Sequence, residues 1–303
     1  MKILVTGHDG FVGQHLVERI KFGNCLYFLR NDLRNYDAVR HEVLTVNPDI
    51  ILHLAARSEV EKSFYEQIEF SEVNYVGTVN LIEAAKELTN LKNFIFPSTM
   101  EVYGWQPISD LVKEGKEVNI EVFDETTIPN PNAPYAVAKY ACEKYLEYAY
   151  RCYGLPYTIV RQTNTYGRKD NDFFITEHVI TQMIKDPSNI NLGCGLPYRN
   201  FLYIDDLIDA WEVIINNPEL CTGHVFCLGP NNAIRIFDYV DLIAKKMNWS
   251  GKVNWNSKPS RPGEIYMLNS SSDKLTRLTS WYPKIDLSEG LDKTIRYWKE
   301  KMT

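Results

Sequence analysis

Two polar residues near the middle of the chain have the types and the spacing of reactive groups. The stretch FPSTMEVYG, residues 96–104, places a hydroxyl at Thr99 and a carboxylate at Glu101, close after the apolar run NFIF. Residues i and i+2 of an extended strand point to the same side, so both side chains are predicted to face a ligand at the exit of a buried strand. The alternative for Glu101 is a structural role, as a salt-bridge partner or a helix cap.

A second pair lies in YAVAK, where Tyr135 and Lys139 are four residues apart in a helical pattern and share one face. A tyrosine with a pKa near 10 is a poor base at neutral pH. An ammonium about 4 Å away contributes about 4 kcal/mol at an effective dielectric constant of about 20, which predicts a tyrosine pKa about three units lower. Such a phenol is a usable general base. Because this spacing is common by chance, a surface pair is the alternative.

The N-terminal stretch TGHDGFVG has the features of a dinucleotide-binding turn. Gly7, Gly10 and Gly13 follow the first predicted strand and open the first predicted helix. Glycines let the backbone turn tightly and approach a pyrophosphate, whose charge is met by free N–H groups at the positive end of the helix. The order of strand, glycines and helix favours this interpretation over a merely tight turn.

The choice between NAD and NADP depends on the residue after the second predicted strand, CLYFL. Enzymes that use NAD usually have an acidic residue there, which binds the ribose hydroxyls. This chain has Arg30, which suits a 2′-phosphate, so we favour NADP over NAD. In the alternative reading Arg30 is a solvated loop charge and Asp32 supplies the acid.

The elements that must position these groups alternate between short apolar runs and helical patterns. This alternation predicts a parallel sheet with helices on both faces, a doubly wound α/β fold. From about Gly223 onward the elements are shorter and indicate a smaller lobe beside the sheet. Expected strands cover KILVTG, CLYFL, DIILHLAA, KNFIFPST and PYTIVRQ, and expected helices cover FVGQHLVERIKF, YDAVRHEVLTVNP, VNYVGTVNLIEAAKE and PYAVAKYACEKYLEYAYRCYG. The loops Trp105–Pro134 and Gly167–Asn200 are long enough to cover a site.

The composition argues against several classes of function. The net charge of −6, without basic runs, gives no surface for nucleic acid, so no nucleic-acid partner is expected. The apolar start of MKILVTGHDG is too short for a signal peptide, and no segment has the length of a membrane span, so a cytoplasmic protein with no membrane partner is expected. The six cysteines lack metal-binding spacing, and no metal site is predicted.

Taken together, these motifs resemble the extended short-chain dehydrogenase/reductase family of nucleotide-sugar epimerases and dehydratases. The matching stretches are TGHDGFVG, HLAARSEVEKSF, VNYVGTVNLIEAA, PSTMEVYG, PYAVAK, RQTNTYG, RNFLYIDDL and RPGE. The resemblance implies a Rossmann domain for NAD(P) at residues 1–165, with 201–217 returning to it. It implies a lobe for a nucleoside-diphosphate sugar at residues 166–200 and 218–303, and a homodimer.

The resemblance also implies a role for individual residues. Tyr135 is the base, Lys139 holds the nicotinamide ribose and tunes Tyr135, and Thr99 is the catalytic hydroxyl. The expected cofactor-binding positions are Gly7, Gly10, Phe11, Val12, Gly13, Arg30, Asp32, Leu33, Leu54, Ala55, Ala56, Asn74, Tyr135 and Lys139. The expected substrate-binding positions are Ser58, Thr99, Asn164, Arg199 and Arg261, the two arginines suiting a diphosphate through their forked donors.

Within this family Glu101 favours a 4,6-dehydratase. Oxidation at C4 of the sugar acidifies the C5 hydrogen, which a positioned carboxylate can remove before the 6-hydroxyl is eliminated. One departure is Met100, because some dehydratases have an aspartic acid at that place. The alternatives are a 4-epimerase, a decarboxylase and an NADPH-dependent 4-ketosugar reductase. More remote is a non-catalytic NAD(P)-sensing protein, which usually lacks the tyrosine or the lysine.

Overall fold

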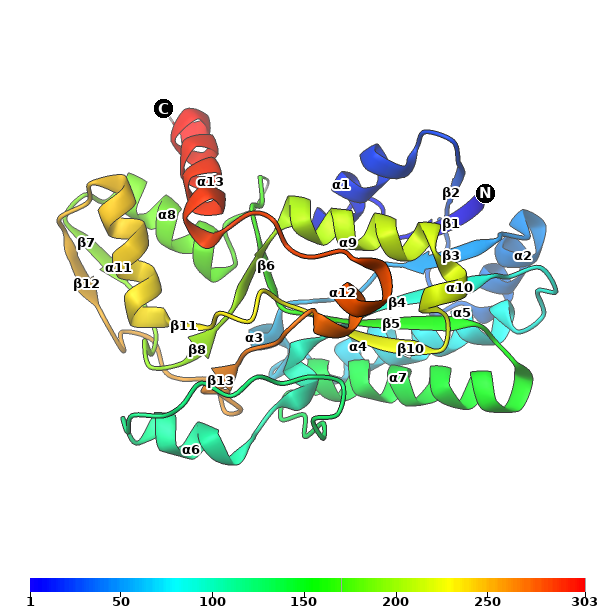
Figure 1. The fold of residues 1–303 in the computed structure, drawn as a ribbon, viewed down its shortest axis with the longest axis horizontal. Helices are drawn as coiled ribbons and strands as arrows, with labels where there is room; N and C mark the ends of the chain where they lie inside the picture. The colour runs from blue at the N-terminus through cyan, green and yellow to red at the C-terminus, as the bar shows by residue number, and fades with distance from the viewer. Residues whose placement is uncertain (170, 303) are drawn as a thin grey trace.

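The computed structural model describes residues 1–169 and 171–302 and shows an α/β fold built on a six-stranded sheet (Figure 1). The strands of this sheet pair in parallel, in the order β10-β5-β4-β3-β1-β2. Their bounds are β1 (Lys2–Thr6), β2 (Cys25–Phe28), β3 (Ile50–His53), β4 (Asn93–Thr99), β5 (Tyr157–Gln162) and β10 (His224–Leu228). The sheet confirms the predicted doubly wound α/β class.

Helices cover both faces of the sheet, because alternate residues of each buried strand point to opposite sides. Ile3 and Val5 of β1 join one apolar core, whereas Leu4 joins the other. The first core lies under α1 (Phe11–Ile20) and α9 (Ile204–Asn216), and the second under α2 (Tyr36–Val46), α5 (Gly77–Ala85) and α7 (Pro134–Tyr153). Figure 1 shows α9 above the sheet and α7 below it.

A smaller lobe lies at the left of Figure 1. Its helices are α8 (Ile175–Lys185), α11 (Ile236–Met247) and α13 (Leu287–Met302). Its strands are β7 (Asn189–Asn191), β8 (Tyr198–Arg199), β11 (Ile234–Arg235), β12 (Lys252–Asn254) and β13 (Met267–Leu268), and β6 (Asn164–Tyr166) pairs with β9 (Phe201–Tyr203) between the lobe and the sheet. Shorter elements are α3 (Val60–Ser63), α4 (Gln67–Ser71), the π-helix η1 (Glu72–Val76), the 3₁₀-helix η2 (Met100–Tyr103), α6 (Pro107–Lys113), α10 (Pro218–Cys221) and α12 (Asp273–Thr279).

The structure departs from the predicted elements in three places. Strand β10 lies in the main sheet, although residues 218–303 were assigned to the lobe. The two long loops contain α6 and α8. The strand that carries Thr99 ends there, and η2 begins at Met100, so the same-side argument for Thr99 and Glu101 was wrong. Helix α9 packs on α1 through the shared apolar core, and Arg19 of α1 also pairs with Asp209 of α9, at 2.7 Å.

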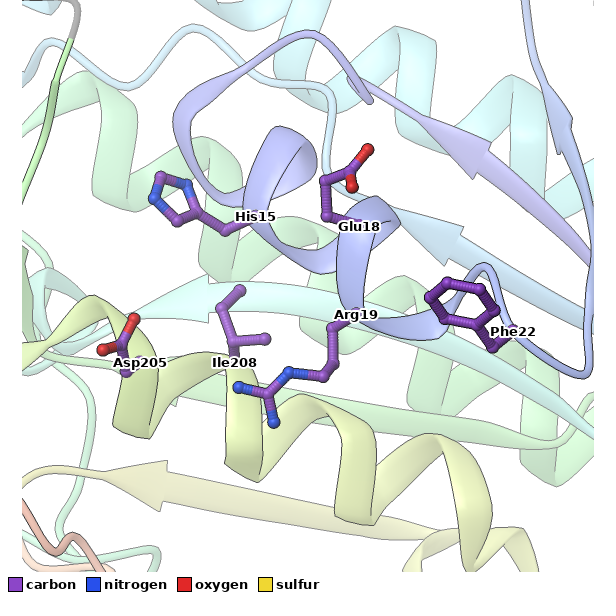
Figure 2. A pocket seen from close by; sticks show the side chains of 6 residues that line it. All are labelled: His15, Glu18, Arg19, Phe22, Asp205 and Ile208. Atoms are coloured by element: carbon purple, nitrogen blue, oxygen red, sulfur yellow. The ribbon is translucent and has the colours of Figure 1, made fainter.

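A hollow of about 270 Å³ lies between α1 and α9 (Figure 2). It is lined by His15, Glu18, Arg19, Phe22, Asp205 and Ile208. None of these is a predicted site residue, and Arg19 is paired with Asp209 and Glu212. Because α1 and α9 cover the face of the sheet opposite to α7, the hollow lies over that face.

In the described ranges, every helix is too short or too polar to cross a bilayer.

Candidate active site

The helix α7 brings the predicted tyrosine and lysine to the exit of β4. Tyr135 is 8% exposed and Lys139 is 4% exposed, so both are buried rather than a surface pair. The hydroxyl of Tyr135 is hydrogen-bonded to the side chain of Thr99. The Lys139 ammonium donates a hydrogen bond to the carbonyl oxygen of Pro97, at 2.8 Å, and lies 4.5 Å from the ring centre of Phe96. Three groups that are distant in sequence thus meet at one strand end.

The carboxylate of Glu101 faces this cluster although it is not on an extended strand. Thr99 Oγ1 accepts a hydrogen bond from the Glu101 backbone N–H, at 3.2 Å, and so caps η2. The Oε2 atom of Glu101 is buried and has no hydrogen-bond partner among the described residues. Its charge acts on Tyr135, Arg199 and Arg261. A buried carboxylate oxygen without a partner is costly, which indicates a place where a ligand binds.

The electrostatics of Tyr135 contradict the predicted depression of its pKa. Burial and the negative charge of Glu101 raise the pKa of Tyr135 above its ordinary value, and the hydrogen bond from Thr99 offsets this only in part. The Lys139 ammonium does not stabilise the phenolate, because it points at the carbonyl oxygen of Pro97. Burial also lowers the pKa of Lys139 to about 8. The phenol of the ligand-free protein is therefore protonated at neutral pH.

Two arginines lie on the lobe side of the site. Arg199, on β8, is 7% exposed and donates to Glu264 Oε1 at 3.1 Å. Arg261 donates to both carboxylate oxygens of Glu264, at 2.9 and 3.2 Å. Burial lowers the pKa of Arg261, but the charges of Glu101 and Glu264 outweigh this and raise it. The forked donors of two arginines suit a doubly charged diphosphate.

The glycine loop at residues 7–13 fits a dinucleotide. Gly7 has φ of +66°, and a Cβ atom there would lie 2.6 Å from the backbone nitrogen of Ala55. A Cβ atom on Gly13 would lie 2.8 Å from the Cα atom of His8. Only glycine fits at both positions, and the first turn of α1 has no acidic residue to repel a pyrophosphate. Phe11 and Val12 form that turn.

Asn74 and the loop after β3 are held by a buried polar network that the sequence analysis missed. The side chain of Asn74 donates to the carbonyl oxygen of Arg57 at 2.9 Å and accepts from its N–H at 2.8 Å. His53 is hydrogen-bonded to the hydroxyls of Thr6, at 2.7 Å, and Thr78, at 2.8 Å. Burial lowers the pKa of His53 to about 3, so it is neutral. The sequence did contain a signal for this network, because Thr6 and His53 are polar residues at the ends of the apolar runs KILVT and IILH.

The remaining predicted residues lie at or near the ends of strands. Leu54, Ala55 and Ala56 follow β3, where the Ala55 N–H donates to Thr6 Oγ1 at 3.0 Å. Leu33 is a core residue, packed under Gly77. Arg30 and Asp32 are exposed and follow β2, and Ser58 is exposed and follows β3. Asn164 is the first residue of β6.

The chain is similar in sequence to a known family of enzymes. The sequence profile of the NAD-dependent epimerase/dehydratase family matches residues 3–229. The chain is 28% identical over 331 residues to a dTDP-D-glucose 4,6-dehydratase of Bos taurus, covering 99% of this chain and 89% of that protein. It is 27% identical over 318 residues to a putative UDP-glucose 4-epimerase of Methanocaldococcus jannaschii, covering 98% of each.

Among solved structures, a UDP-glucose 4-epimerase of Thermotoga maritima determined with UDP-glucose has a TM-score of 0.87 and 26% identity, with 100% of each chain covered. The likeness to enzymes of both reaction types extends over the sheet and the lobe. Because the profile match includes the glycine loop, Thr99 and the Tyr135–Lys139 pair, the chain belongs to the NAD-dependent epimerase/dehydratase family.

Proposed function

We propose that the protein is an NAD(P)-dependent nucleoside-diphosphate-sugar 4,6-dehydratase. The observation that carries this proposal is the buried, unpartnered Oε2 atom of Glu101, whose charge is felt by Tyr135 and by both arginines of the lobe. A simple 4-epimerase needs no carboxylate base beside the tyrosine, because its ketone only rotates and is reduced from the other face. The dehydratase named among the relatives supports the same choice.

In the first step Tyr135 removes the proton of the sugar 4-hydroxyl, while Thr99 donates a hydrogen bond to the same oxygen. The bound dinucleotide supplies a hydride acceptor at C4, a positive charge that favours the phenolate, and the hydride that is later returned to C6. Lys139, held at the carbonyl of Pro97, is proposed to bind the ribose of that dinucleotide. The sugar leaves this step as a 4-ketone.

In the second step Glu101 removes the C5 proton, which the neighbouring ketone has made acidic. The electron pair of the C5–H bond forms the C5–C6 double bond as the C6–O bond breaks. The 6-hydroxyl needs a proton to leave as water, and the newly protonated Glu101 supplies it. The carboxylate is then regenerated. When the sugar is reduced at C6, C5 takes up a proton from the solvent and the 4-ketone is kept, while Tyr135 releases to the solvent the proton that it took from the 4-hydroxyl.

The substrate's diphosphate is proposed to bind Arg199 and Arg261, with Glu264 fixing their orientation. The lobe at residues 166–200 and 229–303 would then hold the nucleotide, with β10 counted in the dinucleotide-binding domain. The test is incubation with UDP-, GDP-, CDP- and dTDP-sugars, followed by the alkaline absorbance of a 4-keto product. Absence of that signal with formation of an epimer would contradict the dehydratase.

The second candidate is a 4-epimerase, which the surroundings of Met100 favour. Met100 is 2% exposed and packs in an apolar cluster with Val102, Ile108 and Met267. No second acid therefore accompanies Glu101 at that position, and the elimination step depends on one carboxyl group alone. Formation of an epimer by the wild-type protein would select this alternative.

We further propose that the cofactor is NADP. Asp32 is bound by the guanidinium of Arg34, which holds its pKa at about 2, and Glu42 accepts hydrogen bonds from the Arg30 N–H and from Asn31. Asp32, the alternative acid, and its neighbour Glu42 are thus both engaged. Among the described residues, no carboxylate pairs with the Arg30 guanidinium, which is exposed after β2. It is available for a 2′-phosphate.

Arg30→Asp should weaken NADPH binding at least about tenfold and favour NADH, because a charge-assisted hydrogen bond becomes a repulsion. Fluorescence titration of the purified protein with both dinucleotides measures the change. Arg40→Ala is the matched control, since that exposed arginine is paired with Glu87 at 2.5 Å. A wild-type protein that binds NADH more tightly than NADPH would contradict the proposal.

We infer a homodimer that buries the outer surface of α4 and α7. These helices pack on each other, and a hollow of about 500 Å³ lies along them. Exposed apolar side chains surround it, with Ile68 76% and Val137 52% exposed. Val137→Lys should convert a dimer into a monomer, because it places a charge in the apolar interface. Light scattering after gel filtration measures this, and a monomeric wild type at all concentrations would contradict it.

A further inference from the structure

An ion pair lies inside the protein behind the catalytic residues. Glu143 follows Tyr135 and Lys139 on the same face of α7, is 0% exposed, and pairs with Arg161 of β5, which is 4% exposed. The guanidinium donates from Nε to both carboxylate oxygens, at 3.1 and 3.2 Å, and from Nη2 to Oε2 at 2.7 Å. The mechanism above uses neither residue.

This pair completes a set of contacts between α7 and the end of β4. Three consecutive residues of β4 each contact a different residue of α7, and these three residues lie four apart along the helix. The carbonyl oxygen of Pro97 accepts from Lys139, and Thr99 is hydrogen-bonded to Tyr135. Between them, Ser98 Oγ donates to Glu143 Oε1. Ser98 is also the strand partner of Arg161 in the β4–β5 ladder, so β4, β5 and α7 meet at the carboxylate of Glu143.

The same arginine reaches the segment that carries Glu101. Arg161 Nη1 donates to the hydroxyl of Tyr103 at 3.0 Å, and this hydroxyl donates to the carbonyl oxygen of Asp124 at 2.5 Å. Tyr103 ends η2, which begins one residue before Glu101. Glu143 and Arg161 thus connect the helix of Tyr135 with the turn of Glu101.

A buried ion pair of this kind is a poor stability device, since apolar residues of similar volume often stabilise a fold as well or better. Its fixed, bidentate geometry does set the relative position of the elements that it joins. We propose that the Glu143–Arg161 pair is a positioning device that holds Tyr135 and Lys139 in register with Thr99 and Glu101. The kinetic consequences rest on the function proposed above, whereas the geometry does not.

The charge of Glu143 also acts on Lys139. Burial lowers the pKa of Lys139, and the carboxylate of Glu143 opposes this, whereas burial raises the pKa of the neighbouring Cys142 thiol to about 12 and keeps it neutral near pH 7. The other titratable groups at Lys139 are Tyr135, held protonated, and His53 of β3, held neutral. Removing the carboxylate of Glu143 lowers the pKa of Lys139 further, so the protonated lysine is lost at a lower pH.

The test uses two variants. The double variant Glu143→Leu/Arg161→Met replaces the ion pair by apolar residues. The single variant Arg161→Lys keeps the positive charge but removes the forked donors of the guanidinium. We expect both proteins to fold, with kcat lower by about 10- to 100-fold and the KM for the sugar nearly unchanged. In the double variant, the loss of activity at alkaline pH moves to lower pH. Lys144→Met/Glu147→Gln is the matched control, because this pair, at 3.0 Å on the same helix, lies at the surface, with Lys144 exposed and Glu147 half-buried.

Dinucleotide affinity, measured by fluorescence, is the readout that does not depend on turnover. We expect the double variant to bind about tenfold more weakly, since Lys139 is displaced. If the wild type converts no sugar, the proposed function fails while this affinity still decides the positioning role. Wild-type kcat, pH profile and affinity in a folded double variant would overturn the proposal. Failure of both variants to fold would assign the pair to stability and overturn it as well.

Discussion

Tyr135→Phe should reduce kcat by about a thousandfold while leaving the fold and dinucleotide binding intact. The phenol is the group in the site that can take the proton of the sugar 4-hydroxyl, and general acid–base catalysis of this kind contributes about 10²- to 10⁴-fold. The loss of one buried hydroxyl, hydrogen-bonded to Thr99, has a small effect on stability by comparison. Product formation and thermal unfolding measure the two effects.

Tyr150→Phe is the control for this change, because Tyr150 lies on the same helix and is 45% exposed. It should leave kcat unchanged. A Tyr135→Phe protein that turned over at a rate near that of the wild type would show that another group moves the proton. A protein that bound the dinucleotide normally but did not turn over would agree with the proposed role.

Glu101→Gln should abolish formation of the 4-keto-6-deoxy product, by at least about a hundredfold, because an amide cannot accept the C5 proton. The substitution keeps the shape of the side chain, so affinity for the nucleotide sugar should change little. It also removes a negative charge that raises the pKa of Tyr135, which should therefore fall toward its ordinary value. Alkaline absorbance measures the product, and NMR of ¹³Cζ-labelled tyrosine measures the titration.

Glu114→Gln is the control, since Glu114 is a 57% exposed residue paired with Lys116 in the same part of the chain. If Glu101→Gln retained full dehydration, Glu101 would be a structural residue. It would then no longer favour a dehydratase over a 4-epimerase. If the variant lost dehydration but the nucleotide sugar still reduced the bound dinucleotide, the separation of the two steps would be supported.

Motifs with local geometry could be predicted from the sequence. The glycine loop requires only a strand, a turn and a helix in consecutive order, and the structure has them at residues 2–20. The four-residue spacing of Tyr135 and Lys139 likewise fixes their common face once α7 forms. The doubly wound sheet follows from the alternation of elements, with β10 as the strand that was placed in the wrong domain.

Features that depend on contacts distant in sequence could not be predicted. The pKa of Tyr135 was predicted to fall, but Lys139 is held by Pro97, 42 residues away, and the carboxylate of Glu101 adds a negative charge. The ion pair of Glu143 and Arg161 joins a helix to a strand and leaves no local pattern. The turn at Met100 could not be predicted either. The residues MEVY have strand-like types, but in the structure they form the 3₁₀-helix η2.

The most direct test of the central claim, that Glu101 and Tyr135 act on one sugar, is a reaction in D₂O followed by NMR of the product. Nucleoside-diphosphate sugars of the four bases are incubated with the protein and catalytic NADP or NAD. The account predicts a product that has lost one water, carries deuterium at C5 and leaves the dinucleotide without net change. A C4 epimer with protium at C5, or stoichiometric oxidation of NADPH, would contradict it.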